Sequence, residues 1–326
     1  MTMIKQTYLV TGGSGFLGYS LVKRLIPKSK KIFVFDNNFR GSFKKFNNNE
    51  KKKLQFIKGD IRKKSNLEKI IKKTDVVYHL AFINGTKHFY QNPKLVLDVG
   101  IKGTMNVLEI IRESKNVRKF FYASSSEVYN QPKKIPTDEQ AEILIPDPRN
   151  SRFSYGGAKA LGEILTYNYL KDTSTKFCIF RPHNLFGPEM GFEHVIPDVI
   201  KKIIYKSKRL TKNNCHIEIQ GTGAETRAFC FIEDAIDQLE IIEKNFKNKE
   251  IYHVGQQHEI TIKKLVQLIS SYIGVKVKIR NKKLLKGSAL RRCPKISKIK
   301  KIGYRKKNNF LFGLYTTIDW YKNYFL

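Results

Sequence analysis

The sequence predicts an α/β fold with a doubly wound parallel sheet and a smaller C-terminal substrate-binding lobe. Three observations predict it: short apolar runs alternate with helical patterns, a glycine-rich turn joins the first run to a helix, and prolines interrupt the pattern beyond about residue 175. We expect one domain at 1–175 and a second at 176–326, with some segments of the second returning to the first.

The first predicted strand, 8–10, leads into the glycine-rich stretch TGGSGFLG at 11–18 and a helix from Phe16. Gly12 permits the tight turn, Gly15 lets the backbone approach a phosphate, and Gly18 allows close packing of helix and sheet. The free N–H groups and dipole of a helix N-terminus attract a pyrophosphate. The stretch therefore predicts a dinucleotide site.

The second predicted strand, 32–35, indicates which dinucleotide binds. It ends at Asp36, roughly 20 residues beyond the glycines, where a carboxylate accepts hydrogen bonds from the adenosine ribose and repels a 2′-phosphate. This favours NAD, although Arg40 nearby leaves NADP open. A turn role for Asp36 is the structural alternative.

Further strands are expected at 54–58, 76–80 and 120–123. The segment 44–53, rich in Asn and Lys, is predicted to be a polar loop. Asp60 follows the third strand, where its carboxylate or backbone could reach the adenine.

In the second half, prolines and glycines predict irregular pieces that form a lid or substrate lobe. The prolines concerned are Pro182, Pro188 and Pro197.

The chain is strongly basic, with 62 Lys and Arg against 28 Asp and Glu and a net charge of +34. Its 326 residues, 41% of them apolar, suffice for a large core. Because the lysines are scattered and no aromatic nucleic-acid motif accompanies them, we expect no nucleic-acid partner. Such a surface would attract anionic substrates.

The cysteines show neither close pairing nor the histidine spacing of a zinc site, so we expect inert thiols, a reducing compartment and no metal. They are Cys178, Cys215, Cys230 and Cys293. The first strand begins too early for a signal peptide, and no apolar run reaches the ~18 residues of a membrane helix. A cytoplasmic protein without membrane association is expected.

Tyr155 and Lys159 lie four residues apart and share one face of a predicted helix. A nearby ammonium lowers the pKa of the phenol, which makes Tyr155 a general base for a hydroxyl proton. Ser125, in the serine-rich stretch after the strand 120–123, would orient the same hydroxyl. Alone, the pair is more often an ordinary helix-surface pair; together with the nucleotide loop it indicates catalysis.

The chain resembles the extended short-chain dehydrogenase/reductases of the nucleotide-sugar epimerase and dehydratase family, which have a Rossmann sheet, over essentially its whole length. The stretches that carry the resemblance are TGGSGFLG (11–18), GDI (59–61), YHLA (78–81), SSSEVY (124–129), YGGAK (155–159), RPHNLFGPEMGFEHVIP (181–197), GTGAETRAFCFIEDA (221–235) and RRCPKISK (291–298).

The resemblance implies roles for individual residues. Ser125, Tyr155 and Lys159 would be catalytic, and Lys159 would also touch the nicotinamide ribose. The residues implied to line NAD are Gly15, Phe16, Leu17, Asp36, Asp60, Ile61, Leu80 and Ala81. A nucleotide-diphosphate sugar would be held by Asn184, Arg227 and Arg292, of which Arg292 could instead have a surface role. A homodimer through the helix of Tyr155 and a helix at 103–112 is also implied.

Two residues depart from the family's pattern. Gly100 stands where many relatives have Asn beside the cofactor, so another group must supply what that amide does. Lys295 replaces an acidic residue common after the proline of the last motif, and the contacts of that loop are therefore in doubt.

The reaction depends on Glu127. In similar dehydratases and decarboxylases a Glu stands here, and in the dehydratases it removes a proton from carbon 5, but the Asp that precedes it in deoxythymidine-type dehydratases is Ser126 in this chain. A helix-capping role for Glu127 is equally open. We expect an NAD-dependent nucleotide-sugar 4-epimerase that acts through a transient 4-keto sugar, as in polysaccharide biosynthesis. The alternatives are a 4,6-dehydratase or decarboxylase using Glu127, or a non-catalytic NAD- or RNA-binding relative.

Overall fold

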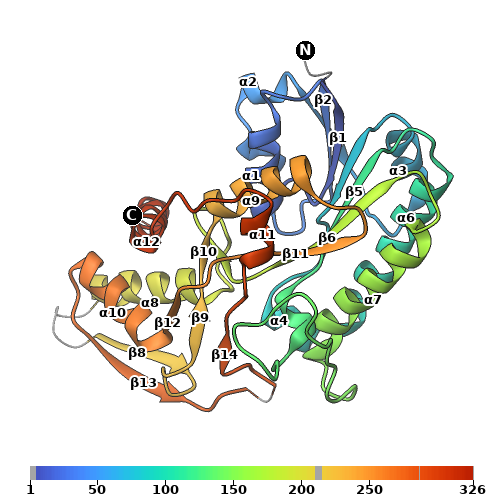
Figure 1. Ribbon diagram of the computed structural model, residues 1–326. Coiled ribbons are helices and arrows are strands. Elements are labelled where there is room, and N and C mark those ends of the chain that lie inside the picture. Colours follow the sequence, from blue (N-terminus) through green and yellow to red (C-terminus); the bar gives the residue numbers. More distant parts are fainter. Residues whose placement is uncertain (1–4, 210–214, 286, 326) are drawn as a thin grey trace. The chain divides into compact units, whose positions relative to one another are not determined.

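The computed structural model describes residues 5–209, 215–285 and 287–325 (Figure 1). By its internal contacts the chain divides into two compact units. The first comprises Met1–Val128, Ile145–Arg181 and Ile242–Tyr252; the second comprises Tyr129–Leu144, Pro182–Ile241 and His253–Leu326. Both units are thus built from separated stretches of sequence. The predicted domain boundary at 175 stays a prediction.

The first unit is built on a seven-stranded sheet with the order β11-β6-β5-β4-β1-β2-β3. The strands are β1 (Thr7–Thr11), β2 (Lys31–Asp36), β3 (Leu54–Lys58), β4 (Val76–His79), β5 (Lys119–Ala123), β6 (Lys176–Pro182) and β11 (Glu250–Val254). Pairing is parallel from β6 through to β3. The doubly wound sheet is confirmed. The strands β1, β2 and β3 are added in one direction, and β4, β5 and β6 are added on the other side of β1. Folds of this kind bind ligands at the point between β1 and β4, where the strand order switches.

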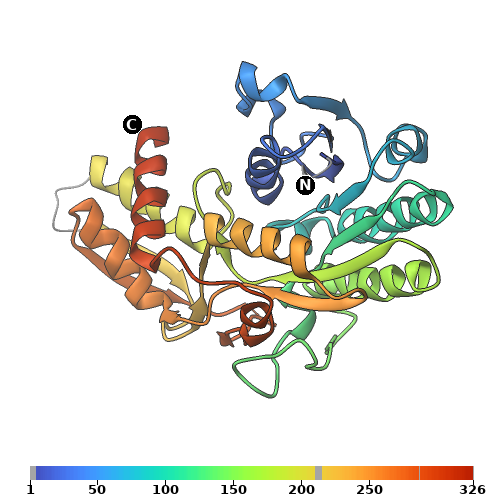
Figure 2. The same ribbon diagram turned by 45° about the horizontal axis from the view of Figure 1, so that its top comes forward.

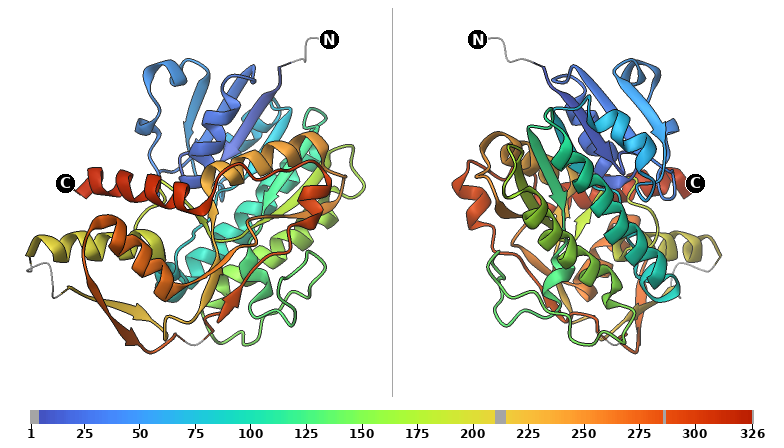
Figure 3. Two further views of the ribbon diagram at one scale, coloured as in Figure 1. Left: turned by 60° about the vertical axis from the view of Figure 1, so that its left-hand side comes forward. Right: turned by 90° about the vertical axis from the view of Figure 1, so that its right-hand side faces the viewer.

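Helices connect the strands of this unit. They are α1 (Phe16–Leu25), α2 (Asn48–Lys51), α3 (Lys64–Ile71), α4 (Thr86–Gln91), α5 (Pro93–Leu97), α6 (Gly103–Glu113) and α7 (Phe153–Leu170), with short 3₁₀ turns η1 (Phe43–Lys45) and η3 (Ser126–Tyr129) and a π-helical segment η2 (Asp98–Lys102). Helices α3, α6 and α7 form one layer (Figure 2), and α6 and α7 run side by side (Figure 3).

The central strands are buried on both faces. Leu9 and Phe33 belong to the cluster that packs with α3, α6 and α7, while their neighbours Val10 and Val34, on the opposite face, are also fully buried. Burial on both faces explains why these strands read as continuous apolar runs rather than as alternating ones.

The prediction of a polar loop at 44–53 is wrong for part of the segment. Short helical turns, η1 and α2, occupy part of it. Asn47 accepts the N–H of Glu50, and the Glu50 carboxylate accepts the N–H of Asn47, which is a capping box. Asn47, one of the asparagines that suggest a loop, is therefore the N-cap of a short helix.

The second unit is more regular than the prolines suggest. Its strands are β7 (Leu185–Phe186), β8 (Cys215–Gln220), β9 (Thr226–Ala228), β10 (Cys230–Phe231), β12 (Glu259–Thr261), β13 (Val277–Lys282) and β14 (Arg291–Arg292), and its helices are α8 (Val195–Arg209), α10 (Ile262–Ile273), α11 (Ser297–Lys301) and α12 (Phe310–Phe325). Helix α9 (Ile232–Asn245) contributes to both units. Pro197 lies in the first turn of α8, where its missing N–H costs nothing.

Among the described residues, no helix is both long and apolar enough to span a membrane. Cys178, Cys230 and Cys293 are buried and form no disulfide bond among the described residues, and the side chain of Cys215 lies outside the described part of the structure.

A buried ion pair attaches α7 to the sheet. Arg181 on β6 and Glu163 on α7 are almost fully buried, with Nη2 and Oε2 2.5 Å apart and a second bond from Nε at 2.8 Å. The Glu163 carboxylate also accepts the hydroxyl of Ser124, which follows β5. One carboxylate therefore connects two strand ends with the helix.

Arg181→Leu should lower the free energy of unfolding by about 3–5 kcal/mol, because it leaves the Glu163 charge buried without its main partner. Urea denaturation followed by circular dichroism measures this. The double variant Arg181→Leu, Glu163→Leu should recover much of the loss, and an unchanged midpoint in the single variant would contradict the structural role.

Candidate active site

The predicted cofactor residues of the first unit gather at the carboxyl ends of its parallel strands. Gly12 follows β1, Asp36 ends β2, Asp60 follows β3, and Leu80 and Ala81 follow β4. Parallel strands present these ends at one edge of the sheet, so the topology brings together residues far apart in the sequence.

The glycine-rich loop is sterically restricted to glycine at critical places. Gly12 has φ 71°, and a Cβ there would lie 2.8 Å from the backbone of Ala81. A Cβ at Gly18 would lie 2.2 Å from the carbonyl oxygen of Gly12. The loop therefore packs against its neighbours through bare backbone, which leaves the N-terminus of α1, with Phe16 and Leu17, close to the strand ends.

Asp36 is connected to this loop. Its carboxylate is largely buried and accepts the N–H groups of Ser14 at 2.9 Å and Asn38 at 2.7 Å. Burial raises the pKa of Asp36, and these hydrogen bonds act in the opposite direction. Arg40, the residue that left NADP open, donates from Nη1 to the Asn84 carbonyl at 2.5 Å.

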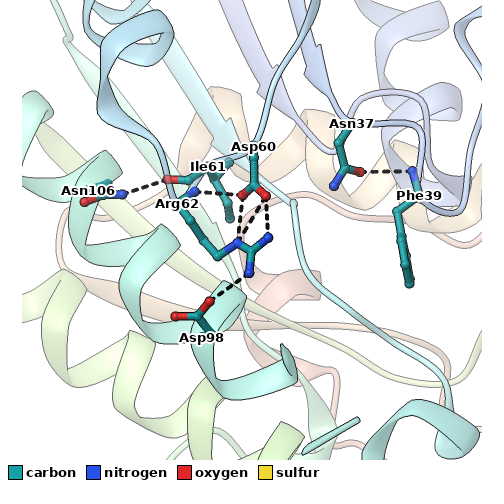
Figure 4. Close-up of polar contacts among 7 residues, drawn as sticks. All are labelled: Asn37, Phe39, Asp60, Ile61, Arg62, Asp98 and Asn106. Carbon is teal, nitrogen blue, oxygen red and sulfur yellow. Dashed lines mark hydrogen bonds and ion pairs between the residues drawn. The ribbon is translucent and has the colours of Figure 1, made fainter. Parts of the chain in front are cut away.

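Asp60 lies in a charged network that the sequence analysis did not foresee (Figure 4). Arg62 bonds to both carboxylate oxygens of Asp60, at 3.1 and 2.6 Å, and its Nη1 lies 2.8 Å from Asp98. The hydrogen bond from Arg62 holds the pKa of Asp60 below its usual range. Asn106 donates to the Ile61 carbonyl at 2.9 Å, which fixes the backbone after Asp60. An arginine two residues after Asp60 was the available signal.

Tyr155 and Lys159 lie on α7, as predicted, and both are buried. The Lys159 Nζ is 5.9 Å from the centroid of the Tyr155 ring and donates to the Ala123 carbonyl at 2.5 Å. Burial lowers the pKa of Lys159 to about 7, against the opposing charge of Glu163 one turn along. Phe89 stacks on the Tyr155 ring, with centroids 4.7 Å apart.

Ser125 lies two residues after the end of β5, and its hydroxyl accepts the N–H of Glu127 at 3.2 Å. This bond caps the short turn η3, so the capping group is the serine and Glu127 lies inside the turn. Ser124, its neighbour, instead faces Glu163.

Glu127 is part of an ion pair. Its Oε2 lies 3.4 Å from Nη2 of Arg152, whose side chain is 9% exposed. A Cβ at Gly156 would lie 2.9 Å from the Glu127 carbonyl oxygen, so the glycine after Tyr155 allows α7 to approach this turn. The partner Arg152 was not predicted.

The predicted substrate residues belong to the second unit. Arg227 on β9 and Arg292 on β14 are direct partners in a parallel strand pair. The Arg227 guanidinium donates to the carbonyls of Thr226 and Ala289, both at 2.7 Å. Asn184 has φ 43° and donates to the Ala228 carbonyl at 3.3 Å.

Arg291, which the sequence offered as a substitute for Arg292, is otherwise engaged. It is half-exposed and forms an ion pair with Glu259, with Nη2 and Oε1 2.6 Å apart. Lys295, the departure in the same segment, donates its backbone N–H to the Thr137 carbonyl at 2.6 Å. The last motif is therefore held by backbone contacts that do not need an acidic residue at 295.

Comparison with known proteins identifies relatives over the full length of the chain. A model described as "NAD dependent epimerase/dehydratase family" matches residues 8–255. A Methanocaldococcus jannaschii protein named "Putative UDP-glucose 4-epimerase" is 30% identical over 319 residues, covering 97% of this chain and 98% of that protein. A UDP-N-acetyl-alpha-D-glucosaminuronate decarboxylase of Bacillus cytotoxicus is 26% identical, covering 98% of both.

Solved structures share the fold. A UDP-N-acetylglucosamine 4-epimerase from Methanobrevibacter ruminantium, in complex with UDP-N-acetylmuramic acid, superposes with a TM-score of 0.88 at 24% identity, covering 99% of this chain and 100% of that one. A UDP-glucose 4-epimerase of Thermotoga maritima with UDP-glucose gives 0.87 at 22% identity, covering 98% and 100%.

The first unit fits NAD on its own geometry. The glycine loop is free of side chains where a diphosphate needs the backbone, and the Asp36 carboxylate, at the end of β2, suits two ribose hydroxyls. Ser14 reinforces the fit, because its buried hydroxyl has no hydrogen-bond partner among the described residues.

Asp36→Ala should reduce the NAD retained by the purified protein, with affinity falling about 10–100-fold because a charge-assisted acceptor is lost. Acid release followed by chromatography measures the nucleotide per chain. Asn37→Ala, which removes an exposed side chain bonded only locally to the Phe39 N–H, is the matched control and should retain NAD. Equal retention in both variants would remove Asp36 from the site.

Proposed function

Because the chain belongs to the NAD dependent epimerase/dehydratase family and is an NAD-dependent enzyme, we propose that it is a nucleotide-sugar 4-epimerase. The observation that carries the proposal is the buried pair of Tyr155 and Lys159 on α7, at the end of the sheet where Ser125 also lies. A protein that only bound NAD would have no use for a buried ammonium beside a phenol.

Each residue has a distinct role in the proposed reaction. Tyr155 removes the proton of the sugar's 4-hydroxyl, and Ser125 donates a hydrogen bond to the same oxygen as it becomes a carbonyl. Lys159 provides the positive charge that favours the phenolate. Bound NAD would supply the acceptor, and then the donor, of the hydride at carbon 4. Rotation of the keto sugar before that return inverts the carbon.

The Glu127 ion pair favours epimerisation over dehydration. A carboxylate that removes a proton from carbon 5 must give up part of its bond to Arg152, 3.4 Å away. The epimerase needs no second base, so in it Glu127 keeps this bond. Neither the comparisons nor the structure favours the dehydratase, the decarboxylase or the non-catalytic alternative.

For the nucleotide end of the substrate, the second unit offers two neighbouring arginines. Arg227 and Arg292 face each other across the β9 and β14 pair, and like charges so placed are stabilised by an anion. A diphosphate supplies it. Asn184 completes the proposed set. UDP-sugars are the first candidates, because the 4-epimerases with similar folds are named for them.

The proposed enzyme is a homodimer that works in the cytoplasm. Leu161, Ile164 and Tyr167 are 36%, 55% and 45% exposed and follow one face of α7. A second copy would cover this apolar stripe. The described cysteines are buried and form no disulfide bond with one another, which suits a reducing compartment.

Tyr155→Phe should abolish turnover, with kcat falling at least about 100-fold because the base is lost, while NAD retention is unchanged. The wild-type protein is incubated without added cofactor with UDP-, GDP-, CDP- and dTDP-sugars, and products are separated by chromatography and weighed by mass spectrometry. A product of unchanged mass and altered retention is expected. Loss of water or carbon dioxide would contradict epimerisation and implicate Glu127.

Arg292→Gln should raise KM for the nucleotide sugar about 10–100-fold, because one charge-assisted contact to the diphosphate disappears. Steady-state kinetics measures this KM, with the nucleotide sugar that the preceding assay identifies as substrate. Arg291→Gln, one residue away and paired with Glu259, is the control and should change KM less than about twofold. Similar effects of the two variants would show general attraction rather than a specific contact.

A further inference from the structure

Phe82 contacts both members of the catalytic pair. It follows β4 and the residues Leu80 and Ala81 that line the cofactor site. The Lys159 Nζ lies 3.8 Å from the centroid of the Phe82 ring, the shortest of its aromatic contacts, and the ring meets that of Tyr155 edge-on, with centroids 5.2 Å apart.

The ring is accommodated because residue 100 is glycine. Gly100 lies in the π-helical segment η2, and a Cβ there would be 2.3 Å from Cζ of Phe82 and 3.0 Å from Cβ of Ala158 on α7. Any side chain at 100 would therefore compete with the Phe82 ring for the same space. The two residues form a matched pair, and the glycine that departs from the family's pattern has a physical reason.

We propose that Phe82 is a positioning residue that holds the Lys159 ammonium against the face of its ring, and that Gly100 keeps the space this ring requires. A cation over an aromatic face is attracted by the ring's quadrupole, and more strongly when water is excluded. The expected effect of Phe82 on turnover rests on the proposed function, whereas its expected effect on the pKa of Lys159 does not.

The other charged and titratable groups near Lys159 do not by themselves neutralise its ammonium, so the Phe82 ring can contribute to its stability. Glu163, on the same helix, is bound to Arg181, and Tyr122 from β5 presents its ring 5.3 Å from Nζ. His79 on β4 is neutral at physiological pH, because burial lowers its pKa to about 3. Tyr155 completes the set. The ammonium thus lies among groups of which Glu163 alone carries a negative charge, and that charge is shared with an arginine.

The direction of the effect follows from the burial of Lys159. Desolvation favours the neutral amine, and an aromatic face favours the ammonium. Removing the ring therefore lowers the pKa of Lys159 below its present value of about 7. The charged fraction at neutral pH falls, and with it the help that Lys159 gives to the Tyr155 phenolate.

Competitive trace labelling with acetic anhydride, read out by mass spectrometry of the Lys159 peptide between pH 5 and 10, tests the proposal on the protein as purified. Phe82→Leu should move the labelling midpoint down by about one pH unit. With the nucleotide sugar that the panel assay identifies as substrate, kcat at pH 7 should fall about 3–10-fold. KM should stay within about twofold, since the binding residues are untouched.

Gly100→Ala is the independent second variant. It keeps Phe82 but displaces the end of its ring, so it should lower the midpoint in the same direction. The double variant Phe82→Leu, Gly100→Ala should match Phe82→Leu alone, because the alanine then meets no ring. Phe89→Leu, which removes the ring stacked on Tyr155, is the control and should leave the Lys159 midpoint unchanged.

An unchanged midpoint in Phe82→Leu, or an equal shift in Phe89→Leu, would overturn the proposal. Additive shifts in the double variant would overturn the pairing with Gly100. If no nucleotide sugar is turned over but the midpoint shifts as expected, the proposed function fails and the role of Phe82 stands.

Discussion

The buried carboxylate of Glu163 is the interaction on which the arrangement of the candidate active site depends. It accepts the Ser124 hydroxyl at the end of β5 and the Arg181 guanidinium on β6, and it lies one turn from Lys159 on α7. Because burying an uncompensated charge is costly, the helix has one favourable position relative to the two strands. That position also determines where Tyr155 and Lys159 lie relative to Ser125.

The charge state of the proposed catalytic lysine is controlled by burial more than by direct ion pairs. Lys159 donates to a carbonyl and faces aromatic rings, so its charge is held weakly and its pKa falls to about 7. The contrast with the Asp60, Arg62 and Asp98 network is clear, since there complementary charges face each other in partial contact with solvent. The weakly held charge of Lys159 suits proton transfer. The paired charges of Asp60, Arg62 and Asp98 suit a structural role that holds their loops in place.

Much of the first unit could be predicted from the sequence, because short-range patterns determine it. The strand ending at Asp36, the glycine turn and the four-residue spacing of Tyr155 and Lys159 each contain their own signal. The contacts of Arg152 and Phe82 could not be predicted. Each depends on a side chain meeting a segment distant in the sequence, and no periodicity indicates such a contact. The second unit's helix α8 was hidden because a proline in a first turn resembles a proline that ends a helix.

The first unit is formed from separated stretches of sequence, and this affects how the chain folds during synthesis. Its sheet includes β11, which belongs to the stretch Ile242–Tyr252 and beyond, whereas the six other strands end by Pro182. A ribosome must therefore add about seventy further residues, most of them belonging to the other unit, before β6 gains its outer neighbour. During that interval β6 is an open edge that can pair with another nascent chain. Chaperone dependence and aggregation of truncated products are the expected cost of interleaving the two units.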